Sequence, residues 1–313
     1  MSAPPAPSSD SQVYKRNVRV RRWKLLASYF GDWFLTVALA ALFLALENVH
    51  GFRRRFSLQD ESIQYPFTVK ERVPNWLLGV ICLGIPGVLM PIVNLLTVRM
   101  LWDLHNSWLG LVLSLAISGS ITQIFKITAG RPRPDLIARC APVQGAQNPP
   151  VYGLVDDSIC TQTEYAIMID GWRSFSSGHS CLSFAGLGFL SLYLAGKLHL
   201  FDSRGQTSKA WISIFPLFGA ALVATTRTMD YRHHWQDVLV GAVIGITTAY
   251  FAYRQYYPTL ESPLSHRPFS PRYAPIQAQG SKDANGDKSG NQDVELGPVQ
   301  EQGATGVEGT VPR

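Results

Sequence analysis

The chain has 313 residues, of which 46% are hydrophobic and only 16% are Asp, Glu, Lys or Arg. Soluble domains average about 25% charged residues, so this composition disfavours a water-soluble globular enzyme. The first 257 residues hold 23 Lys and Arg against 15 Asp and Glu, whereas the remainder is net acidic and poor in large apolar side chains. Four cysteines are too few, in a chain of this length, for a secreted disulfide scaffold.

The N-terminal segment, residues 1–25, is polar and basic. Its first ten residues are rich in Pro, Ser and Ala and lack the apolar region of a cleavable signal peptide. Six cations follow between Lys15 and Lys24. Basic residues beside a first span favour the cytosolic side of a membrane, so we expect a cytosolic N-terminus.

Six apolar stretches follow, each about 20 residues long, which is the length that crosses about 30 Å of hydrocarbon. The fold class expected is therefore all-α, with a six-span transmembrane helical bundle over residues 26–255. A buried helical core in a soluble domain is the disfavoured alternative, because such runs rarely recur in one domain. The spans are expected at Leu26–Leu46, Trp76–Val98, Trp108–Ile127, His179–Leu198, Ala210–Thr226 and Trp235–Tyr253.

An even number of spans returns residues 256–313 to the cytosol, and the Gly, Gln, Ser and Pro content of this tail predicts disorder. The first, third and fifth loops then face the lumen or the exterior. Loop 1 opposes this assignment, because it carries Arg53, Arg54, Arg55, Lys70 and Arg72. The first helix usually dominates orientation, so we assign the N-terminus to the inside.

Loop 3, residues 128–178, is the longest loop expected between spans, and a basic cluster opens it. The run from Lys126 to Pro134 contains Arg131 and Arg133, and its two prolines end the preceding helix. One guanidinium group can donate to two phosphate oxygens at once, so this run is a candidate phosphate-binding site. The alternative is a group of cations that only anchors the span at the membrane surface.

The same loop ends at Ser176-Ser177-Gly178-His179, directly before the fourth span. Ser177 suits a helix N-cap, and helix N-termini bind anions through free N–H groups. His179 would then stand where a general acid acts. The alternative for His179 is an interfacial histidine with a satisfied hydrogen bond.

A third cluster, from Thr226 to Asp237, joins spans five and six. His233 and Asp237 are four residues apart, so on one helix they would share a face and the carboxylate could accept a bond from the imidazole. That pairing is typical of an activated nucleophile. A metal site of His233, His234 and Asp237 is the alternative, which the surrounding Lys and Arg residues disfavour by repelling a cation.

The expected topology brings the three clusters to one membrane face, and together they resemble the signature of the type 2 phosphatidic acid phosphatase (lipid phosphate phosphatase) superfamily. Ser176 stands where the family has Pro, and Thr226 where it has Ser. The segment 56–67 of loop 1 resembles the same branch, especially fungal diacylglycerol pyrophosphate phosphatases. The matching positions are Lys126, Arg133 and Pro134; Ser177, Gly178 and His179; and Arg227, His233 and Asp237.

The resemblance implies an integral-membrane enzyme that hydrolyses phosphatidate, diacylglycerol pyrophosphate or lysophosphatidate, with no cofactor and no metal. His233 is expected to attack phosphorus and form a phosphohistidine, Asp237 to orient it, and His179 to protonate the leaving oxygen. A polyprenyl-diphosphate or sphingolipid phosphatase would share these residues. A transporter is the non-enzyme alternative, disfavoured because the ionisable residues gather at one edge of the spans. The residues expected to bind phosphate are Lys126, Arg133, Ser177, Gly178 and Arg227.

The expected location is the endoplasmic reticulum, Golgi, vacuole or plasma membrane, with the site facing the lumen or the exterior. Cys140 and Cys160 are the two cysteines of loop 3, and an oxidising lumen would allow a disulfide between them, with two free thiols as the alternative. The expected partners are a lipid phosphate and the membrane, not nucleic acid. The sequence leaves the oligomeric state open.

Overall fold

A computed structural model describes residues 9–202 and 205–272, with side chains described from Trp23 onward except Leu26. Within these residues the chain is helical and contains no strand. In this described part of the chain, six helical segments are long and apolar enough to cross a membrane, as the sequence predicts. They are α1 (Ser9–Glu47), α2 (Asn75–Gly79) continuing through the π-helical η2 (Val80–Gly84) into α3 (Ile85–Leu96), α4 (Leu101–Ala129), α7 (Gly178–Lys197), α8 (Thr207–Met229) and α9 (Trp235–Tyr256).

Several helices are longer than the apolar runs that predict them, and the difference matters most in α1, α4 and α8. Helix α1 begins at Ser9, so much of the expected N-terminal tail is helical. Helix α4 begins before the expected Trp108, because Asp103 is buried there and pairs with Lys197 of α7 at 2.6 Å. Helix α8 ends at Met229, which places Arg227 in its last turn. These helices therefore include charged residues, either paired or near a helix end, that a prediction from hydropathy alone leaves out.

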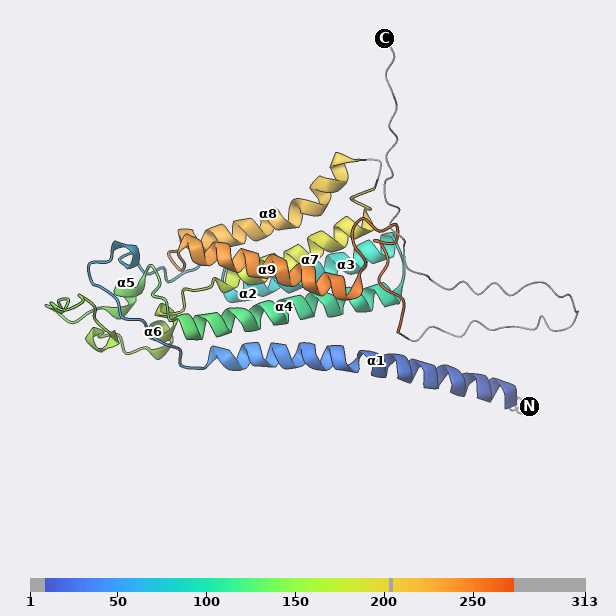
Figure 1. Cartoon of the computed structure of the whole chain (residues 1–313), viewed down its shortest axis with the longest axis horizontal. Helices are drawn as coiled ribbons and strands as arrows, with labels where there is room; N and C mark the ends of the chain where they lie inside the picture. The colour runs from blue at the N-terminus through green and yellow to red at the C-terminus, as the bar shows by residue number, and fades with distance from the viewer. Residues whose placement is uncertain (1–8, 203–204, 273–313) are drawn as a thin grey trace, which may run out of the picture. The chain divides into compact units, whose positions relative to one another are not determined.

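Helix α7 is the centre of the bundle and packs against α4, α8 and α9 (Figure 1). The main apolar core includes Leu109 of α4, Phe189 and Tyr193 of α7, and Tyr253 of α9. Helix α1 packs on α4 at the edge of the bundle (Figure 1), and many of its apolar side chains are exposed, as expected for a surface that faces lipid.

Helix α9 approaches α7 closely because two glycines face it. A Cβ on Gly241 would lie 2.6 Å from the Ser177 carbonyl oxygen, and one on Gly245 would lie 2.3 Å from that of Cys181. Small residues allow such approach between helices in lipid. Gly219 of α8 has ordinary contact only, 3.4 Å to Leu187.

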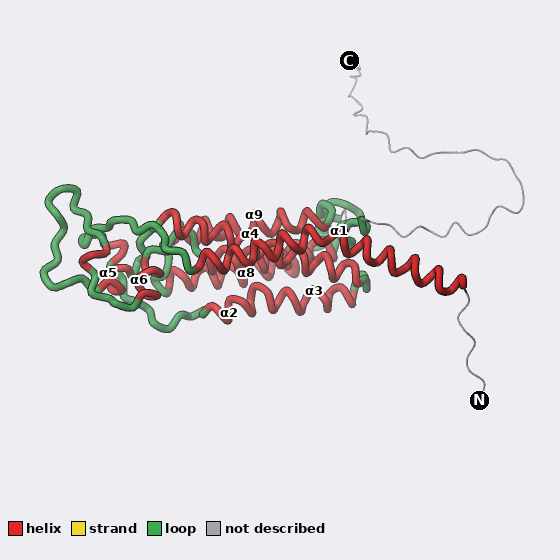
Figure 2. The backbone as a smooth tube through the Cα atoms, turned by 90° about the horizontal axis from the view of Figure 1, so that it is seen from below, coloured by secondary structure: helices red, strands yellow, loops and turns green. Residues whose placement is uncertain are grey.

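The loops that follow α1, α4 and α8 lie at one end of the bundle, where Figure 2 shows them as a cap beyond the helices. The cap includes α5 (Leu136–Cys140), α6 (Tyr165–Gly171) and the short 3-10 helices η1 (Glu61–Ile63) and η3 (Asp157–Ile159). A second apolar core holds it together, formed by Phe56, Ile63, Leu136, Cys140, Val155, Met168 and Trp172.

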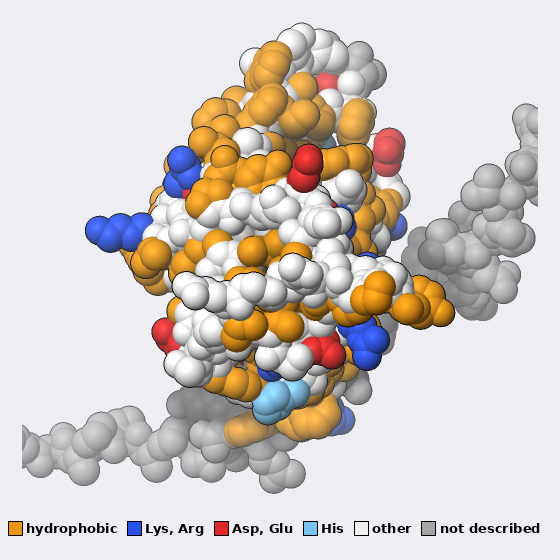
Figure 3. All heavy atoms as spheres, turned by 90° about the vertical axis from the view of Figure 1, so that its left-hand side faces the viewer, with side chains coloured by type: hydrophobic (Ala, Val, Ile, Leu, Met, Phe, Trp, Pro, Cys, Tyr) orange, Lys and Arg blue, Asp and Glu red, His pale blue; other side chains and the backbone are white. Residues whose placement is uncertain are grey.

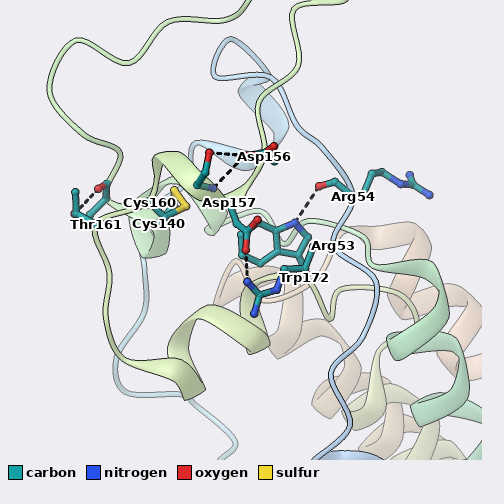
Figure 4. The surroundings of a disulfide bond; sticks show 10 residues. Arg53, Arg54, Cys140, Asp156, Asp157, Cys160, Thr161 and Trp172 are labelled. Carbon is teal, nitrogen blue, oxygen red and sulfur yellow. Dashed lines mark hydrogen bonds and ion pairs between the residues drawn. A yellow bond between two sulfur atoms is a disulfide. The ribbon is translucent and has the colours of Figure 1, made fainter.

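A disulfide joins Cys140 and Cys160 in this cap, with Cα atoms 4.6 Å apart (Figure 4). Beside it Arg53 of loop 1 forms an ion pair with Asp157, and its guanidinium lies 5.5 Å from the Trp172 ring centroid (Figure 4). The basic run of loop 1 is therefore tied to loop 3 by specific contacts.

At the other end of the bundle, the chain after α9 packs against the helices as far as the structure describes it. Trp102 of α4 donates to the Phe269 carbonyl at 2.9 Å, and Arg272 forms an ion pair with Asp32 of α1 at 2.7 Å. The tail expected to be disordered from residue 256 thus begins with a packed segment to residue 272. Residues 273–313 lie outside the described residues.

Candidate active site

The three sequence clusters converge at the cap end of the bundle, where they line a cavity of about 610 Å³. Lys126 and Arg133 come from the end of α4 and the loop after it, and Gly178 and His179 from the start of α7. Arg227 and His233 come from the end of α8 and the following turn. All six of these predicted residues line the cavity, whereas Ser177 and Asp237 do not.

Lys126 and Gly178 lie side by side, which joins the first two clusters. The Lys126 ammonium is 3.1 Å from the position that a Cβ on Gly178 would take. The Lys126 ammonium has no hydrogen-bond or ion-pair partner among the described side chains and main-chain groups. An unpaired ammonium beside the first N–H of a helix is suited to hold an anion.

Arg133 is buried, and both terminal nitrogens of its guanidinium group contact a carboxylate. Its Nη1 and Nη2 each lie 2.7 Å from an oxygen of Asp170, at the end of α6. Asp170 also pairs with Arg139 at 3.1 Å and with Arg232 at 3.3 Å. Burial alone would raise the pKa of Asp170, but Arg133, Arg139 and the neighbouring cations hold it below its usual range.

Arg227 is buried as well and pairs with a carboxylate of loop 1. Its Nη1 lies 2.6 Å from Oε2 of Glu71, and its Nη2 lies 3.2 Å from Asp230. Thr226, which replaces the Ser of the family signature, accepts from Nε of Arg227 at 3.1 Å and Nη2 at 3.0 Å. The hydroxyl of the signature is thus present and orients the guanidinium.

His233 lies in the turn between α8 and α9, with a buried ring. Its Nδ1 is 2.6 Å from the carbonyl oxygen of Ser174, so Nδ1 donates and Nε2 carries the free lone pair of the neutral ring. Burial lowers the pKa of His233 well below its ordinary value, and the positive charges of Arg133 and Lys126 lower it further. The imidazole is therefore neutral at pH 7 and suited to attack an electrophile.

The prediction that His233 and Asp237 share a hydrogen bond is wrong. Helix α9 starts at Trp235 with His234 as its N-cap, so His233 precedes the helix and cannot share a helical face with Asp237. The Asp237 carboxylate instead lies 2.6 Å from Nη1 of Arg131, 2.6 Å from the Ser174 hydroxyl and 3.3 Å from Nδ1 of His234. Ser174 links the two residues, since its hydroxyl donates to Asp237 and its carbonyl oxygen accepts from His233.

His179 lies in the first turn of α7 and touches loop 1. Its Nε2 is 2.9 Å from the Val73 carbonyl oxygen and 3.9 Å from Oε2 of Glu71. Ser177 is the N-cap of α7, as the sequence predicts, and its hydroxyl accepts from the Ser180 N–H at 3.5 Å. Its direct role in phosphate binding stays a prediction.

Glu71, Asp170 and Arg232 also line the cavity, although no sequence pattern predicted them. Glu71 and Asp170 precede the second and fourth spans, so a search for acidic residues near span ends would have included them. Arg232 directly precedes His233 in the third cluster. Among the described residues, no group of three or more His, Cys, Asp and Glu is arranged to hold a metal ion.

Below this polar end the cavity continues between the spans, where its walls are apolar. Phe43 of α1, Leu78 and Leu83 of the second span, Leu115 of α4 and Leu182 of α7 line this part. The cavity therefore offers a cationic end and an apolar end to one molecule.

The outer surface of the cap is not a single basic patch. Figure 3, which views this end, shows basic and acidic side chains interspersed with apolar ones. Arg72 of loop 1 forms an ion pair with Asp230, as Arg53 does with Asp157, so part of the positive charge of loop 1 is neutralised locally.

Comparisons with known proteins identify the family of the chain. The model of the PAP2 superfamily matches residues 107–260. No solved structure matches the chain with significance.

Three curated relatives are similar over most of their length. The probable diacylglycerol pyrophosphate phosphatase 1 of Schizosaccharomyces pombe is 37% identical over 242 residues, covering 76% of this chain and 85% of the relative. The lipid phosphate phosphatase 2 of Arabidopsis thaliana is 39% identical, covering 72% and 77%. The diacylglycerol pyrophosphate phosphatase 1 of Saccharomyces cerevisiae is 34% identical, covering 79% and 84%.

Proposed function

This chain belongs to the PAP2 superfamily as a multi-pass membrane phosphatase, and we propose that it hydrolyses phosphatidate, diacylglycerol pyrophosphate or lysophosphatidate. The observation that carries the proposal is the convergence of three sequence clusters on one cavity with a cationic end and apolar walls. The names of the relatives support the substrate class, since they refer to diacylglycerol pyrophosphate and lipid phosphates.

In the first step the phosphate lies among Lys126, Arg133, Arg227 and the N–H of Gly178. These donors stabilise the charge that develops on the phosphoryl oxygens in the transition state. Nε2 of His233 attacks phosphorus in line with the lipid oxygen, so a P–N bond forms while the P–O bond to the lipid breaks.

His179 completes both steps by moving one proton. It acts as the imidazolium: Nε2–H donates to the Val73 carbonyl, and Nδ1–H gives its proton to the departing lipid oxygen, which leaves the ring neutral. In the second step water attacks phosphorus, the P–N bond breaks and His179 takes back a proton. The products are the dephosphorylated lipid and inorganic phosphate.

The fixed cations favour catalysis without a divalent metal. Lys126, Arg133 and Arg227 already supply positive charge at the cavity end, and Arg173 and Arg232 line it as well. A metal ion bound there would be repelled at short range by these groups.

The apolar walls favour a lipid substrate whose head sits at the membrane surface while a tail extends between the spans. A polyprenyl diphosphate or a sphingolipid phosphate meets the same requirement. These substrates all present a terminal phosphoryl group and differ in the lipid and in whether a second phosphate joins it, so a direct comparison of rates distinguishes them.

We place the site on the lumenal or extracellular side of an endoplasmic reticulum, Golgi, vacuolar or plasma membrane. The disulfide between Cys140 and Cys160 supports this side, because disulfides persist in oxidising compartments. The basic N-terminal segment supports a cytosolic N-terminus, and α1 then carries the chain to the opposite face.

The test measures the hydrolysis of a panel of lipid phosphates by the full chain purified in detergent, with and without a chelator. We expect hydrolysis of lipid phosphates in chelator and an acid-labile phosphoenzyme from ³²P-labelled substrate. His233→Ala should abolish both, and His179→Ala should keep the phosphoenzyme with good leaving groups. A phosphoenzyme in His233→Ala would overturn the mechanism, and activity restored only by a divalent ion would overturn metal independence.

A further inference from the structure

Glu71 of loop 1 contacts the groups that the proposed function assigns to phosphate. Its Oε2 lies 2.6 Å from Nη1 of Arg227 and 3.9 Å from Nε2 of His179, and its Oε1 lies 3.0 Å from Nη2 of Arg232. Glu71 also lines the cavity. A carboxylate held by two guanidinium groups makes the same charge-assisted contacts as a phosphate group.

The main chain beside Glu71 holds it in this position. The Thr68 carbonyl accepts from Nη2 of Arg232 at 3.0 Å, and the Arg72 N–H donates to Asp230 at 3.0 Å. The Val73 carbonyl contacts His179 at 2.9 Å. Segment 68–73 is thus fixed across the third cluster by polar contacts on both sides of Glu71.

The arginines paired with Glu71 each have other partners. Arg227 keeps Asp230 at 3.2 Å and the Thr226 hydroxyl at 3.0 Å. Arg232 keeps Asp170 at 3.3 Å and the Thr68 carbonyl. Departure of the Glu71 carboxylate therefore leaves neither buried guanidinium without a partner, which is the condition under which displacement is inexpensive.

Asp170, the other carboxylate at the cationic end, differs in this respect. It holds Arg133 on both fork nitrogens and also pairs with Arg139, whose side chain is fully buried and lies outside the cavity wall. Arg139 keeps Asp135 at 2.9 Å, but Arg133 has no other carboxylate partner among the described residues. Removal of Asp170 would leave the buried Arg133 guanidinium uncompensated, so Asp170 is expected to stay in place.

We propose that Glu71 competes with phosphate for Arg227 and Arg232, so that substrate displaces its carboxylate and its return helps to release inorganic phosphate. This inference rests on the proposed function. Displacing Glu71 costs the same for both anions, but a lipid substrate also gains binding from the apolar walls whereas the product anion does not. Glu71 therefore weakens retention of the product while the lipid substrate still binds.

The experiment compares wild type with Glu71→Gln, which keeps the shape of the side chain and removes its charge. Inorganic phosphate is titrated into the full-length protein in detergent by calorimetry, and its inhibition constant is measured in the lipid phosphatase assay. We expect about tenfold tighter phosphate binding in Glu71→Gln, and an equal fall in the inhibition constant. Glu61→Gln is the matched control, since Glu61 is an exposed residue of the same loop and should leave both values unchanged.

A role of Glu71 in folding alone predicts weaker binding, not tighter binding. Unchanged or weaker phosphate binding in Glu71→Gln and in a second variant, Glu71→Ala, would overturn the inference while wild type remains an active phosphatase. Failure of the wild type to bind phosphate and to hydrolyse any lipid phosphate would instead overturn the proposed function, and this inference with it.

Discussion

Nδ1 of His233 lies 2.6 Å from the main-chain carbonyl oxygen of Ser174. A carbonyl oxygen can only accept, so this contact places the ring proton on Nδ1 and leaves Nε2 free to attack. The tautomer is therefore set by the main chain of loop 3. Asp237 reaches His233 only indirectly, because its carboxylate accepts from the hydroxyl of the same Ser174 at 2.6 Å.

This arrangement predicts that Ser174 and Asp237 act as one unit. Ser174→Ala removes the hydroxyl contact but keeps the carbonyl that faces His233, so we expect kcat to fall by about tenfold with little change in KM. The kcat of Asp237→Asn should fall further, because Asp237 also pairs with Arg131. In a double-mutant cycle the two losses should be clearly less than additive.

Two results would contradict this coupling. Fully additive losses would show that Asp237 acts without Ser174. A Ser174→Ala variant with wild-type kcat would show that the hydroxyl contact has no effect on His233. Circular dichroism and elution volume should match wild type in each variant, so that loss of folding is separated from loss of positioning.

The depressed pKa of His233 predicts how the site responds to acid. Burial, Arg133 and Lys126 disfavour the imidazolium, so the ring should remain neutral as the pH falls through 6.5 and should protonate only well below it. Protonation blocks Nε2, so the attacking form is lost only below that depressed pKa. Arg133→Gln removes one repelling charge and should move the pKa back up toward its ordinary value.

Imidazole ¹⁵N NMR measures this pKa directly, with His233→Asn used to assign the signal. The measurement does not depend on turnover, which matters because Arg133 is also expected to bind phosphate. A wild-type ring that titrates at or above 6.5, or a pKa that Arg133→Gln leaves unchanged, would refute the electrostatic account.

The disulfide between Cys140 and Cys160 should stabilise the cap and, through it, the site. It closes a segment with a sequence separation of 20, for which a loss of about 2–4 kcal/mol in the free energy of unfolding is expected on removal. Activity should also fall, because α5 carries Arg139, which holds Asp170 beside Arg133. We expect a Cys140→Ser/Cys160→Ser variant to unfold at a lower temperature than wild type.

Dithiothreitol provides the control for this prediction. It should lower the unfolding temperature of wild type to that of the double variant and leave the variant unchanged. Alkylation without reductant should label only the other two cysteines, Cys82 and Cys181, after denaturation. Labelling of all four would exclude the disulfide in the purified protein.

The proposed topology predicts opposite exposure of the two ends of the bundle. In sealed vesicles with the cytosolic side outward, protease should cleave the chain beyond residue 272 and leave loop 3 intact. The enzyme should then act on lipids of the lumenal or outer leaflet. Cleavage within loop 3 from the cytosolic side, with the tail protected, would invert the orientation.

The sequence by itself determined the six spans and the residues of the three clusters. Hydropathy over about 20 residues is a local property, and so is the spacing from Lys126 to Arg133 or from Arg227 to His233. Successive spans alternate in direction, so the end of the third span, the junction before the fourth and the turn between the fifth and sixth had to lie at one end of the bundle. These features follow from chain order and do not depend on how the loops fold.

The tertiary structure alone decided which groups surround the nucleophile. Helix α9 begins after His233, so the spacing to Asp237 does not produce a bond, and Ser174 takes that place from a distant position in the chain. Glu71 reaches Arg227 across a sequence separation of 156. Such contacts form because buried cations require partners, and only the folding of loops 1 and 3 over the helix ends determines which carboxylates supply them.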